Sequence, residues 1–351
     1  MSAGGGGAAA TGAATCTVSH RDAVETSLRA LTNAGVPPAH AALQVDLLVE
    51  GELWNHPSHG LLRLPRVIER IHNGVCDPTT SGVMTWRSDT FLEVDGLNGL
   101  GPVVATAAIE AASERARKHG VAIAAIRNNN HLGMLGWYAH RIAKSGLIVI
   151  AATTSEALVH PWGGRKAMLG TNPIAVGVPC EPHPGGLDMA TSLISMGQVH
   201  DHAHRGEPLQ PGWALDADGE PTTNASAARH GAIAPFGGAK GYALGLGLEL
   251  LVTSLTGAAI GTDVQGTLDS TNVCNKGDLF IVVDPTSSAS TAAAVAAYLD
   301  ALRHSPPADP RVPVSVPGDR AQASRTRRLA DGFPIAESVW NRITELAGPR
   351  P

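Results

Sequence analysis

Residues 120–133 read GVAIAAIRNNNHLG, and this stretch decides which fold the sequence predicts. The run Gly120–Ile126 is apolar and rich in β-branched side chains, which is typical of a covered strand. Residues 132–144 then carry apolar side chains at helical spacing and end in a Lys-Ser-Gly stop signal. His131 therefore lies at a strand-to-helix junction, where open α/β proteins tend to place their chemistry. The alternative is an asparagine turn in which His131 only caps the helix.

Similar patterns organise the rest of the chain, with helices near both ends and alternating strands and helices between them. The expected helices cover residues 18–36, 39–52, 61–71, 103–118, 241–255, 290–303 and 335–347, and the expected strands cover 91–94, 147–153, 174–178 and 279–283. We therefore predict an α/β fold with a mixed sheet in a central domain over 87–284, which contains a long polar excursion over 200–232. A helical domain on the substrate side is expected from 16–86 together with 285–351, and a disordered tail over 1–15.

Composition limits the classes of function. The chain has 351 residues, more than one compact core usually holds, and its formal charge of −5 gives no bulk basic surface for nucleic acid. No apolar run approaches the length that crosses a bilayer, and the first residues do not resemble a signal peptide. Four scattered cysteines show neither zinc nor disulfide spacing, so we expect free thiols and a cytoplasmic protein.

Nucleotide-binding fingerprints are missing. The closest candidate, Gly96-Leu-Asn-Gly-Leu-Gly101, has the order G-x-x-G-x-G, whereas a Rossmann domain needs G-x-G-x-x-G because each glycine has a separate steric role. The sequence also has no P-loop and no G-x-S-x-G nucleophile elbow. These absences argue against a Rossmann domain, a nucleoside triphosphatase and a serine hydrolase of that type.

Two other stretches are suited to binding an anion. In Ser58-His59-Gly60-Leu61-Leu62-Arg63 the arginine can face back toward His59, and it offers a planar fork for a carboxylate beside a group that exchanges protons. In Phe236-Gly-Gly-Ala-Lys-Gly241 a glycine turn opens an apolar helix, whose free N–H groups and Lys240 could hold a phosphate. The simpler interpretations are a capped helix start with a surface arginine and a tight turn with a solvated lysine.

Two further motifs carry ionisable groups. Asp188 follows a short expected strand, where a carboxylate could orient a histidine or bind ribose hydroxyls. His200, His202 and His204 form H-x-H-x-H, and on a strand they would share one face. Because no cysteine lies nearby, we predict no metal site there, although a metal-binding scaffold stays open as an alternative.

Taken together, these motifs resemble the type-two malate/L-lactate dehydrogenase family, which includes ureidoglycolate dehydrogenase, diketogulonate reductase, sulfolactate dehydrogenase and the piperideine-2-carboxylate reductases. The resemblance runs from about Val18 to Asp331. The matching motifs are Ser58-His59-Gly60 with Arg63, Asn128-x-x-His131-x-Gly133, Pro161-x-Gly163-Gly164, Gly170-Thr171-Asn172-Pro173, Asp188-Met189-Ala190-Thr191-Ser192 and Lys240-Gly241. Pro317-Gly318-Asp319 resembles the family's late cofactor-binding P-G-E, with Asp in place of Glu. The resemblance implies a homodimeric NAD- or NADP-dependent oxidoreductase whose cofactor domain is not a Rossmann fold.

The resemblance also implies roles for individual residues. His131 is expected to act as the acid and base, with His59 beside the substrate or the nicotinamide. Arg63 is expected to bind the substrate carboxylate, and Asp188 is included among the catalytic groups. Ser58 and Thr171 complete the expected substrate site, and the expected cofactor residues are Ser155, Asp188, Met189, Ala190, Lys240, Gly241, Pro317, Gly318 and Asp319.

The expected reaction is hydride transfer between nicotinamide and a small 2-hydroxy or 2-oxo acid. Reduction of a cyclic imino acid would use the same carboxylate site and the same hydride chemistry. A catalytically silent protein that keeps a nicotinamide pocket is the alternative outside the enzymes.

Overall fold

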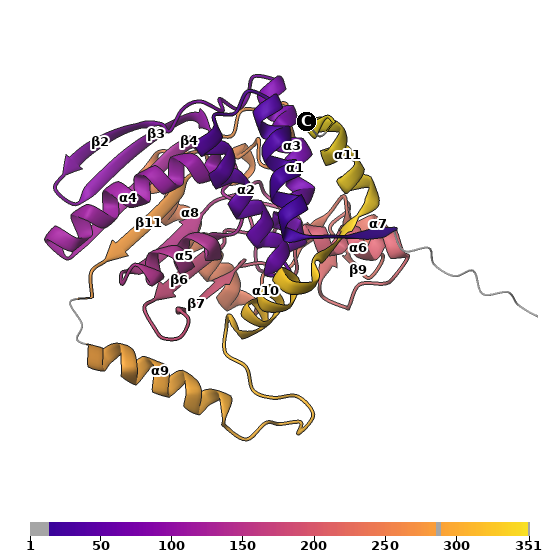
Figure 1. The fold of residues 1–351 in the computed structure, drawn as a ribbon. Coiled ribbons are helices and arrows are strands. Elements are labelled where there is room, and N and C mark those ends of the chain that lie inside the picture. Colours follow the sequence, from indigo (N-terminus) through magenta and orange to yellow (C-terminus); the bar gives the residue numbers. More distant parts are fainter. Residues whose placement is uncertain (1–13, 286–288, 350–351) are drawn as a thin grey trace, which may run out of the picture.

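The computed structural model describes residues 14–285 and 289–349. Its centre is a seven-stranded sheet with the strand order β2-β3-β4-β11-β5-β6-β7 (Figure 1). The bounds are Val83–Ser88 for β2, Phe91–Gly99 for β3, Val121–Asn129 for β4, Ile148–Thr153 for β5, Ile174–Val178 for β6, Gly185–Met189 for β7 and Asp278–Val283 for β11. Strands β3 and β4 pair in parallel and the other neighbours pair antiparallel. The mixed sheet predicted from the sequence is therefore confirmed.

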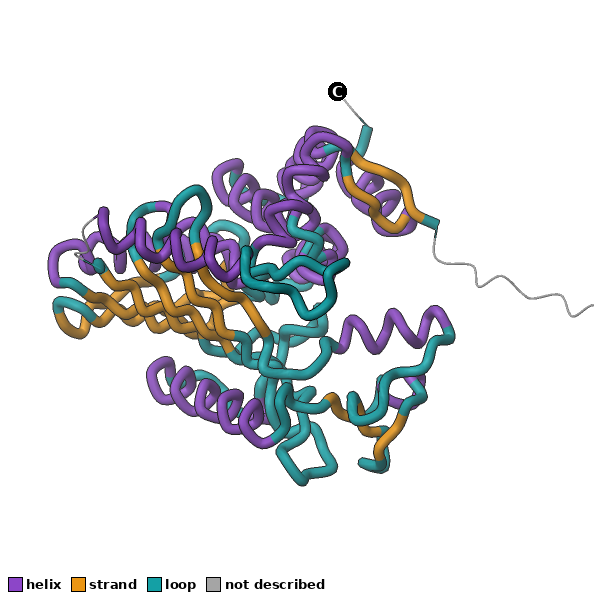
Figure 2. Tube along the Cα trace, turned by 90° about the horizontal axis from the view of Figure 1, so that it is seen from below, coloured by secondary structure: helices purple, strands orange, loops and turns teal. Residues whose placement is uncertain are grey.

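Helices cover both faces of this sheet (Figure 2). Helix α4 (Gly101–His119) packs on one face against β4, where Ala124 and Ile126 belong to the shared core, and α5 (Leu135–Lys144) packs on the same face against β5 and β6. Helix α8 (Ala239–Thr256) packs on the other face, where Leu248 and Val252 contact Ala125. The small alanine side chains on the sheet let the helices approach closely. A close approach is needed because the chain has few aromatic side chains to fill a wider gap.

The two ends of the chain form one helical unit. Helices α1 (His20–Asn33), α2 (Pro38–Leu53), α3 (Leu64–His72) and α11 (Glu337–Ala347) share a core with the start of α4. Strand β1 (Thr15–Val18) pairs antiparallel with β12 (Phe333–Ala336), and Ser19 caps α1 by accepting a hydrogen bond from the Asp22 N–H. The helix expected over 61–71 is split into the 3₁₀ helix η2 (Leu61–Arg63) and α3. Of the expected tail, residues 1–13 lie outside the described residues, and Thr15 begins β1.

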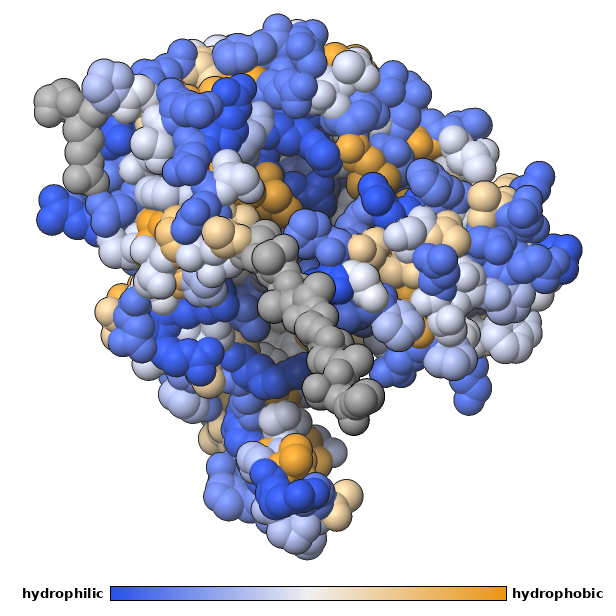
Figure 3. All heavy atoms as spheres, turned by 90° about the vertical axis from the view of Figure 1, so that its right-hand side faces the viewer, coloured by the Kyte–Doolittle hydropathy of each residue, from blue (hydrophilic) through white to orange (hydrophobic). Residues whose placement is uncertain are grey.

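Helices α9 (Ala289–Arg303) and α10 (Asp319–Asp331) lie between the sheet and α11 in the sequence. Helix α9 projects from the body in Figure 1, and no residue from 291 to 303 is buried. Its Tyr298 is 65% exposed. In Figure 3 the projecting part at the bottom is mostly hydrophilic with a small apolar patch, as is much of the rest of that face.

The segment predicted as a polar excursion is a small folded unit. It contains α6 (Met196–Arg205), α7 (Ala225–Ala228) and a three-stranded sheet of β8 (Ala214–Leu215), β9 (Pro221–Thr222) and β10 (Ala232–Ile233). Its own core consists of Val199, Leu209, Ala228 and Ile233 with Val159 and Leu169. A few apolar residues spread over a polar stretch thus suffice for a core when they converge in space.

The three histidines do not lie on a strand, which is the arrangement that would have put them on one face. His200, His202 and His204 lie on helix α6, which begins with a capping box between Ser195 and Gln198. Successive alternate residues point in different directions on a helix, so these three side chains do not share one face. Within residues 14–285 and 289–349, no group of three His, Cys, Asp or Glu side chains has an arrangement that could hold a metal ion.

Among the described helices, none combines the length and the apolar character that a membrane crossing needs. All four cysteines are free.

Candidate active site

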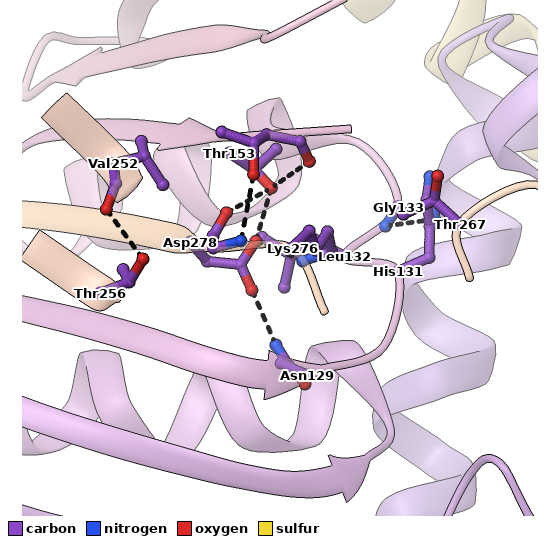
Figure 4. Close-up of polar contacts among 12 residues, drawn as sticks. Asn129, His131, Leu132, Gly133, Thr153, Val252, Thr256, Thr267, Lys276 and Asp278 are labelled. Atoms are coloured by element: carbon purple, nitrogen blue, oxygen red, sulfur yellow. Dashed lines mark hydrogen bonds and ion pairs between the residues drawn. The ribbon is translucent and has the colours of Figure 1, made fainter. Parts of the chain in front are cut away.

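Two histidines from distant parts of the sequence meet at the edge between the helical unit and the sheet. His59 ends the 3₁₀ helix η1 (Pro57–His59), and His131 follows the end of β4. Their rings stack with centroids 5.7 Å apart and an interplanar angle of 26°. Ser58 Oγ lies 3.0 Å from His59 Nδ1. His131 Nδ1 accepts a hydrogen bond from the Gly133 N–H at 3.0 Å (Figure 4). The ring of His131 thereby has a fixed orientation, and its Nε2 has no partner within the described residues.

Arg63 lies beside this pair. Its Nε donates to the Ser58 carbonyl oxygen at 2.8 Å, which fixes the guanidinium and leaves its two terminal nitrogens available. Arg63 and His131 line the same cavity, whose volume is about 40 Å³. A volume of this size has room for a few water molecules or for a small polar ligand. The sequence-predicted juxtaposition of Arg63 with the histidines is present.

Burial and positive charge act together on both imidazoles. Burial, followed by the charges of Arg63 and His56, lowers the pKa of His59 to about 4. Burial, followed by the charges of Arg63, His59 and Lys276, holds the pKa of His131 well below its ordinary value of 6.5. Burial also lowers the pKa of Arg63 to about 10. Both rings are therefore neutral near pH 7, and the site has an excess of positive charge that an anion would relieve.

A buried ion pair supports the loop that carries His131, and it was missed from the sequence. Lys276 binds Asp278 at the start of β11, and both side chains are almost completely buried. The second carboxylate oxygen of Asp278 accepts a hydrogen bond from Asn129 Nδ2 at 3.0 Å (Figure 4). Asn129 precedes His131 by two residues, so the pair fixes the end of β4. The sequence signal that could have revealed this ion pair is Lys276 and Asp278, spaced two residues apart just before an apolar strand.

The predicted cofactor motifs also converge. The Thr191 N–H donates to the Thr171 carbonyl oxygen at 2.8 Å, and the Phe236 N–H donates to the Thr191 carbonyl oxygen at 3.1 Å. Thr171 in turn donates its N–H to Ser155 Oγ at 3.0 Å. Hydrogen bonds thus join three separate segments of the chain, around 155–173, 188–192 and 235–241. Met189 and Ala190 lie in the second of these segments, between Asp188 and Thr191.

Asp188, on β7, is solvent-exposed but lies deep among other protein atoms. Its Oδ2 accepts a hydrogen bond from the Gly136 N–H at 2.6 Å, in the first turn of α5. Desolvation raises its pKa to about 6, partly opposed by that hydrogen bond. No hydrogen bond joins Asp188 to either histidine within the described residues.

The last predicted cofactor motif lies elsewhere. Gly318 adopts a left-handed conformation with φ of 99°, and Asp319 begins α10. The carboxylate of Asp319 binds Arg303 of α9, with Oδ1 2.8 Å from a terminal guanidinium nitrogen. Within the described residues, no hydrogen bond or ion pair joins Pro317, Gly318 or Asp319 to the other candidate groups.

The converging segments suit a dinucleotide. Gly237 and Gly238 have φ of 57° and 63° and lead into the N-terminus of α8, where backbone N–H groups can bind a phosphate. The exposed Lys240 adds a positive charge there, and a Cβ at Gly241 would collide with the Phe236 carbonyl oxygen. Ser192 Oγ is buried with no hydrogen-bond partner in the described part of the chain. These donors, together with the Asp188 carboxylate for ribose hydroxyls, fit the requirements of NAD or NADP.

Comparison with known proteins agrees with this geometry. The malate/L-lactate dehydrogenase family matches residues 18–344. The chain belongs to this family. It is accordingly an NAD(P)-dependent oxidoreductase, and its sheet is the non-Rossmann cofactor domain that the missing glycine fingerprint anticipated.

Individual family members are similar over nearly their whole length. The chain is 33% identical to L-sulfolactate dehydrogenase of Methanothermobacter thermautotrophicus, over 94% of this chain and 96% of that protein. It is 33% identical to the Δ1-pyrroline-2-carboxylate reductase of Pseudomonas fluorescens, over 91% and 95%. The crystal structure of a dehydrogenase from Sinorhizobium meliloti superposes with a TM-score of 0.92 at 49% identity, over 95% and 99%.

Proposed function

We propose that this family member transfers a hydride between a nicotinamide cofactor and C2 of a small 2-hydroxy or 2-oxo carboxylic acid. The observation that carries the proposal is the stacked pair of neutral histidines beside the available guanidinium fork of Arg63. The fork binds the substrate carboxylate in two parallel hydrogen bonds and thereby aims the reacting carbon and its oxygen at the histidines. The bound cofactor supplies or accepts the hydride.

His131 is proposed as the proton donor and acceptor. Because the Gly133 N–H donates to Nδ1, the neutral ring carries its proton on Nε2, where it can contact the substrate oxygen. A carboxylate bound to Arg63 cancels one of the charges that hold the pKa of His131 down. Substrate binding should therefore raise this pKa, so that Nδ1 takes up a proton and releases the hydrogen bond from Gly133. Nε2 of the resulting imidazolium then gives its proton to the substrate oxygen as the hydride reaches C2, and the ring is left neutral with its proton on Nδ1.

His59 and the other predicted residues are proposed to position the reactants. His59, held by Ser58, lies against one side of the substrate, and Thr171 lies at the boundary between substrate and cofactor. Ser155, Asp188, Met189, Ala190, Lys240 and Gly241 are proposed to bind the cofactor. Pro317, Gly318 and Asp319 join that proposal only through the family resemblance, because Asp319 binds Arg303.

Reduction of a cyclic imino acid is the second candidate. It is favoured by the similarity to a Δ1-pyrroline-2-carboxylate reductase, and it needs the same carboxylate fork and hydride geometry. Oxidation of NADH and NADPH should be followed spectrophotometrically with pyruvate, oxaloacetate, other 2-oxo acids and Δ1-pyrroline-2-carboxylate. Turnover of one group identifies the substrate class, whereas no turnover together with no nicotinamide binding would favour a silent scaffold.

The assignment of the two histidines is tested by His131→Ala and His59→Ala, with His119→Ala as the control, since His119 is exposed at the end of α4. We expect His131→Ala to lose hydride transfer over the whole pH range. We expect His59→Ala to keep the pH profile at a reduced kcat/KM. Unchanged turnover in His131→Ala would reject the assignment.

We also propose that the chain forms a homodimer through the outer face of α8. Leu244, Leu250 and Leu251 are 40–49% exposed on this helix, although its other face packs against the sheet. Neighbouring apolar residues of this kind are typical of an interface. Light scattering should give twice the chain mass for the wild type, and Leu251→Lys should shift it toward the monomer. A monomeric wild type would reject the proposal.

A cytoplasmic location is proposed as well, because all four cysteines are free, as in a reducing compartment. Fractionation of cells that express the full chain tests it, and recovery outside the cytoplasm would reject it.

A further inference from the structure

The cavity that contains His131 has an unusual charge. Arg63 lines it from η2, and Arg66 and Arg70 line it from the following helix α3. No aspartate or glutamate is among its lining residues in the described chain. Three arginine residues thus line one small space, and no acidic residue of the described chain lines it with them.

Arg70 contributes charge without being available to a ligand. Its Nε donates to Asn130 Oδ1 at 2.8 Å, and its terminal nitrogens donate to the carbonyl oxygens of Asp269 and Asn272 at 2.7 and 3.0 Å. All three acceptors are neutral, so the hydrogen bonds hold the group in place and leave its positive charge uncompensated. Arg70 therefore contributes a positive charge at a fixed position beside the cavity.

Arg63 and Arg66 differ from Arg70 because their forks are available. Arg63 uses only its Nε internally, and Arg66 makes no hydrogen bond or ion pair within the described residues. Arg66 is exposed, which places it at the entrance of the cavity. The positive charge of Arg66 helps to lower the pKa of both Arg63 and His131. Arg66 is therefore close enough to the two site residues to act on them electrostatically.

Positive groups held close together destabilise one another unless an anion joins them. One substrate carboxylate occupies Arg63 in the proposed function and leaves Arg66 unbalanced at the entrance. We infer that Arg66 binds a second anionic group of the substrate, so that the enzyme selects dianionic 2-hydroxy or 2-oxo acids over monoanionic ones. This inference rests on the proposed function, and it adds a specificity residue that the sequence motifs do not include.

The test compares oxaloacetate with pyruvate in the wild type and in Arg66→Gln. We expect the variant to lose about tenfold in kcat/KM for oxaloacetate, the value of one charge-assisted pair of hydrogen bonds, and to keep its kcat/KM for pyruvate. Arg66→Lys keeps the charge without the fork and should give an intermediate loss. Arg21→Gln is the matched control, because it removes the same charge from the exposed face of α1.

A second measurement does not depend on turnover. Calorimetric titration with malonate and with acetate, in the presence of the oxidised cofactor, should show tighter binding of malonate by the wild type but not by Arg66→Gln. Equal losses for oxaloacetate and pyruvate, or no preference of the wild type for either dianion, would overturn the inference and leave the proposed function intact. A wild type that turns over no 2-oxo acid or imino acid would overturn the proposed function, while the malonate titration would still decide whether Arg66 binds a second anion.

Discussion

Glu52 gives the sharpest prediction about this fold, because it is a buried carboxyl group directly beneath the His59 turn. Its side chain is 2% exposed, and its Oε1 accepts a hydrogen bond from the Leu61 N–H at 2.8 Å. Gly60 packs on the same carboxyl group so closely that a Cβ there would collide with it. Burial raises the pKa of Glu52 from 4.5 to about 7, although the Leu61 hydrogen bond and the charge of Arg328 oppose the rise.

The sign and the size of the effect follow from this pKa. Below pH 4.5 the carboxyl group is protonated in both the folded and the unfolded chain. Between pH 4.5 and about 7 the unfolded chain ionises while the folded protein keeps its proton, so the free energy of unfolding falls as the pH rises. At about 1.4 kcal/mol per pH unit, the total loss is roughly 3 kcal/mol and is complete above the folded pKa.

Glu52→Gln removes this loss while it keeps an oxygen that can accept the Leu61 hydrogen bond. The free energy of unfolding, measured by urea denaturation at a series of pH values, should fall with pH in the wild type by about 3 kcal/mol more than in the variant. Glu69→Gln, on the exposed side of α3, is the control and should change with pH as the wild type does. Parallel pH curves for the wild type and Glu52→Gln would refute the reasoning.

Two further predictions concern the sheet and the cofactor surface. Lys276→Met leaves Asp278 charged and buried, so we expect a loss of about 3–5 kcal/mol in thermal unfolding and a recovery of most of it when Asp278→Asn is added. A double variant no more stable than Lys276→Met would contradict the pairing. Gly241→Ala should weaken NADH binding in a fluorescence titration because its Cβ meets the Phe236 carbonyl oxygen, whereas Gly247→Ala, whose Cβ meets no atom of its own chain within 4 Å, should leave NADH binding unchanged. Equal behaviour of the two alanine variants would show that the close contact is unimportant.

Elements with strong local patterns were predicted well. The helix expected over 103–118 is α4, Gly101–His119, and the strand expected over 174–178 is β6, Ile174–Val178. Strands β1 and β12 were missed because each is four residues long and is stabilised by pairing with a partner more than 300 residues away. Such a pairing leaves no periodic pattern in either segment.

The histidine-rich segment shows where a local signal was overlooked. His200, His202 and His204 suggest a strand if they are considered alone, but the pair Ser195 and Gln198 is a helix-start signature that precedes them. Helix-compatible residues then continue to the glycine stop at 206. These local signals predict the helix, so no tertiary information was needed to assign it.

Some features of the candidate site follow from local sequence, and others depend on the tertiary structure. The sequence by itself determined that His131 follows a strand, that His59 and Arg63 belong to one short turn, and that a glycine turn opens α8, because caps, turns and periodicity depend on neighbouring residues. Only the tertiary structure decided that His59 and His131 stack, that Lys276 and Asp278 lie buried beneath the His131 loop, and that Arg66 faces the same cavity. It also decided the charge state of these groups. Desolvation and the field of nearby charges depend on how distant segments pack, and no local pattern encodes that.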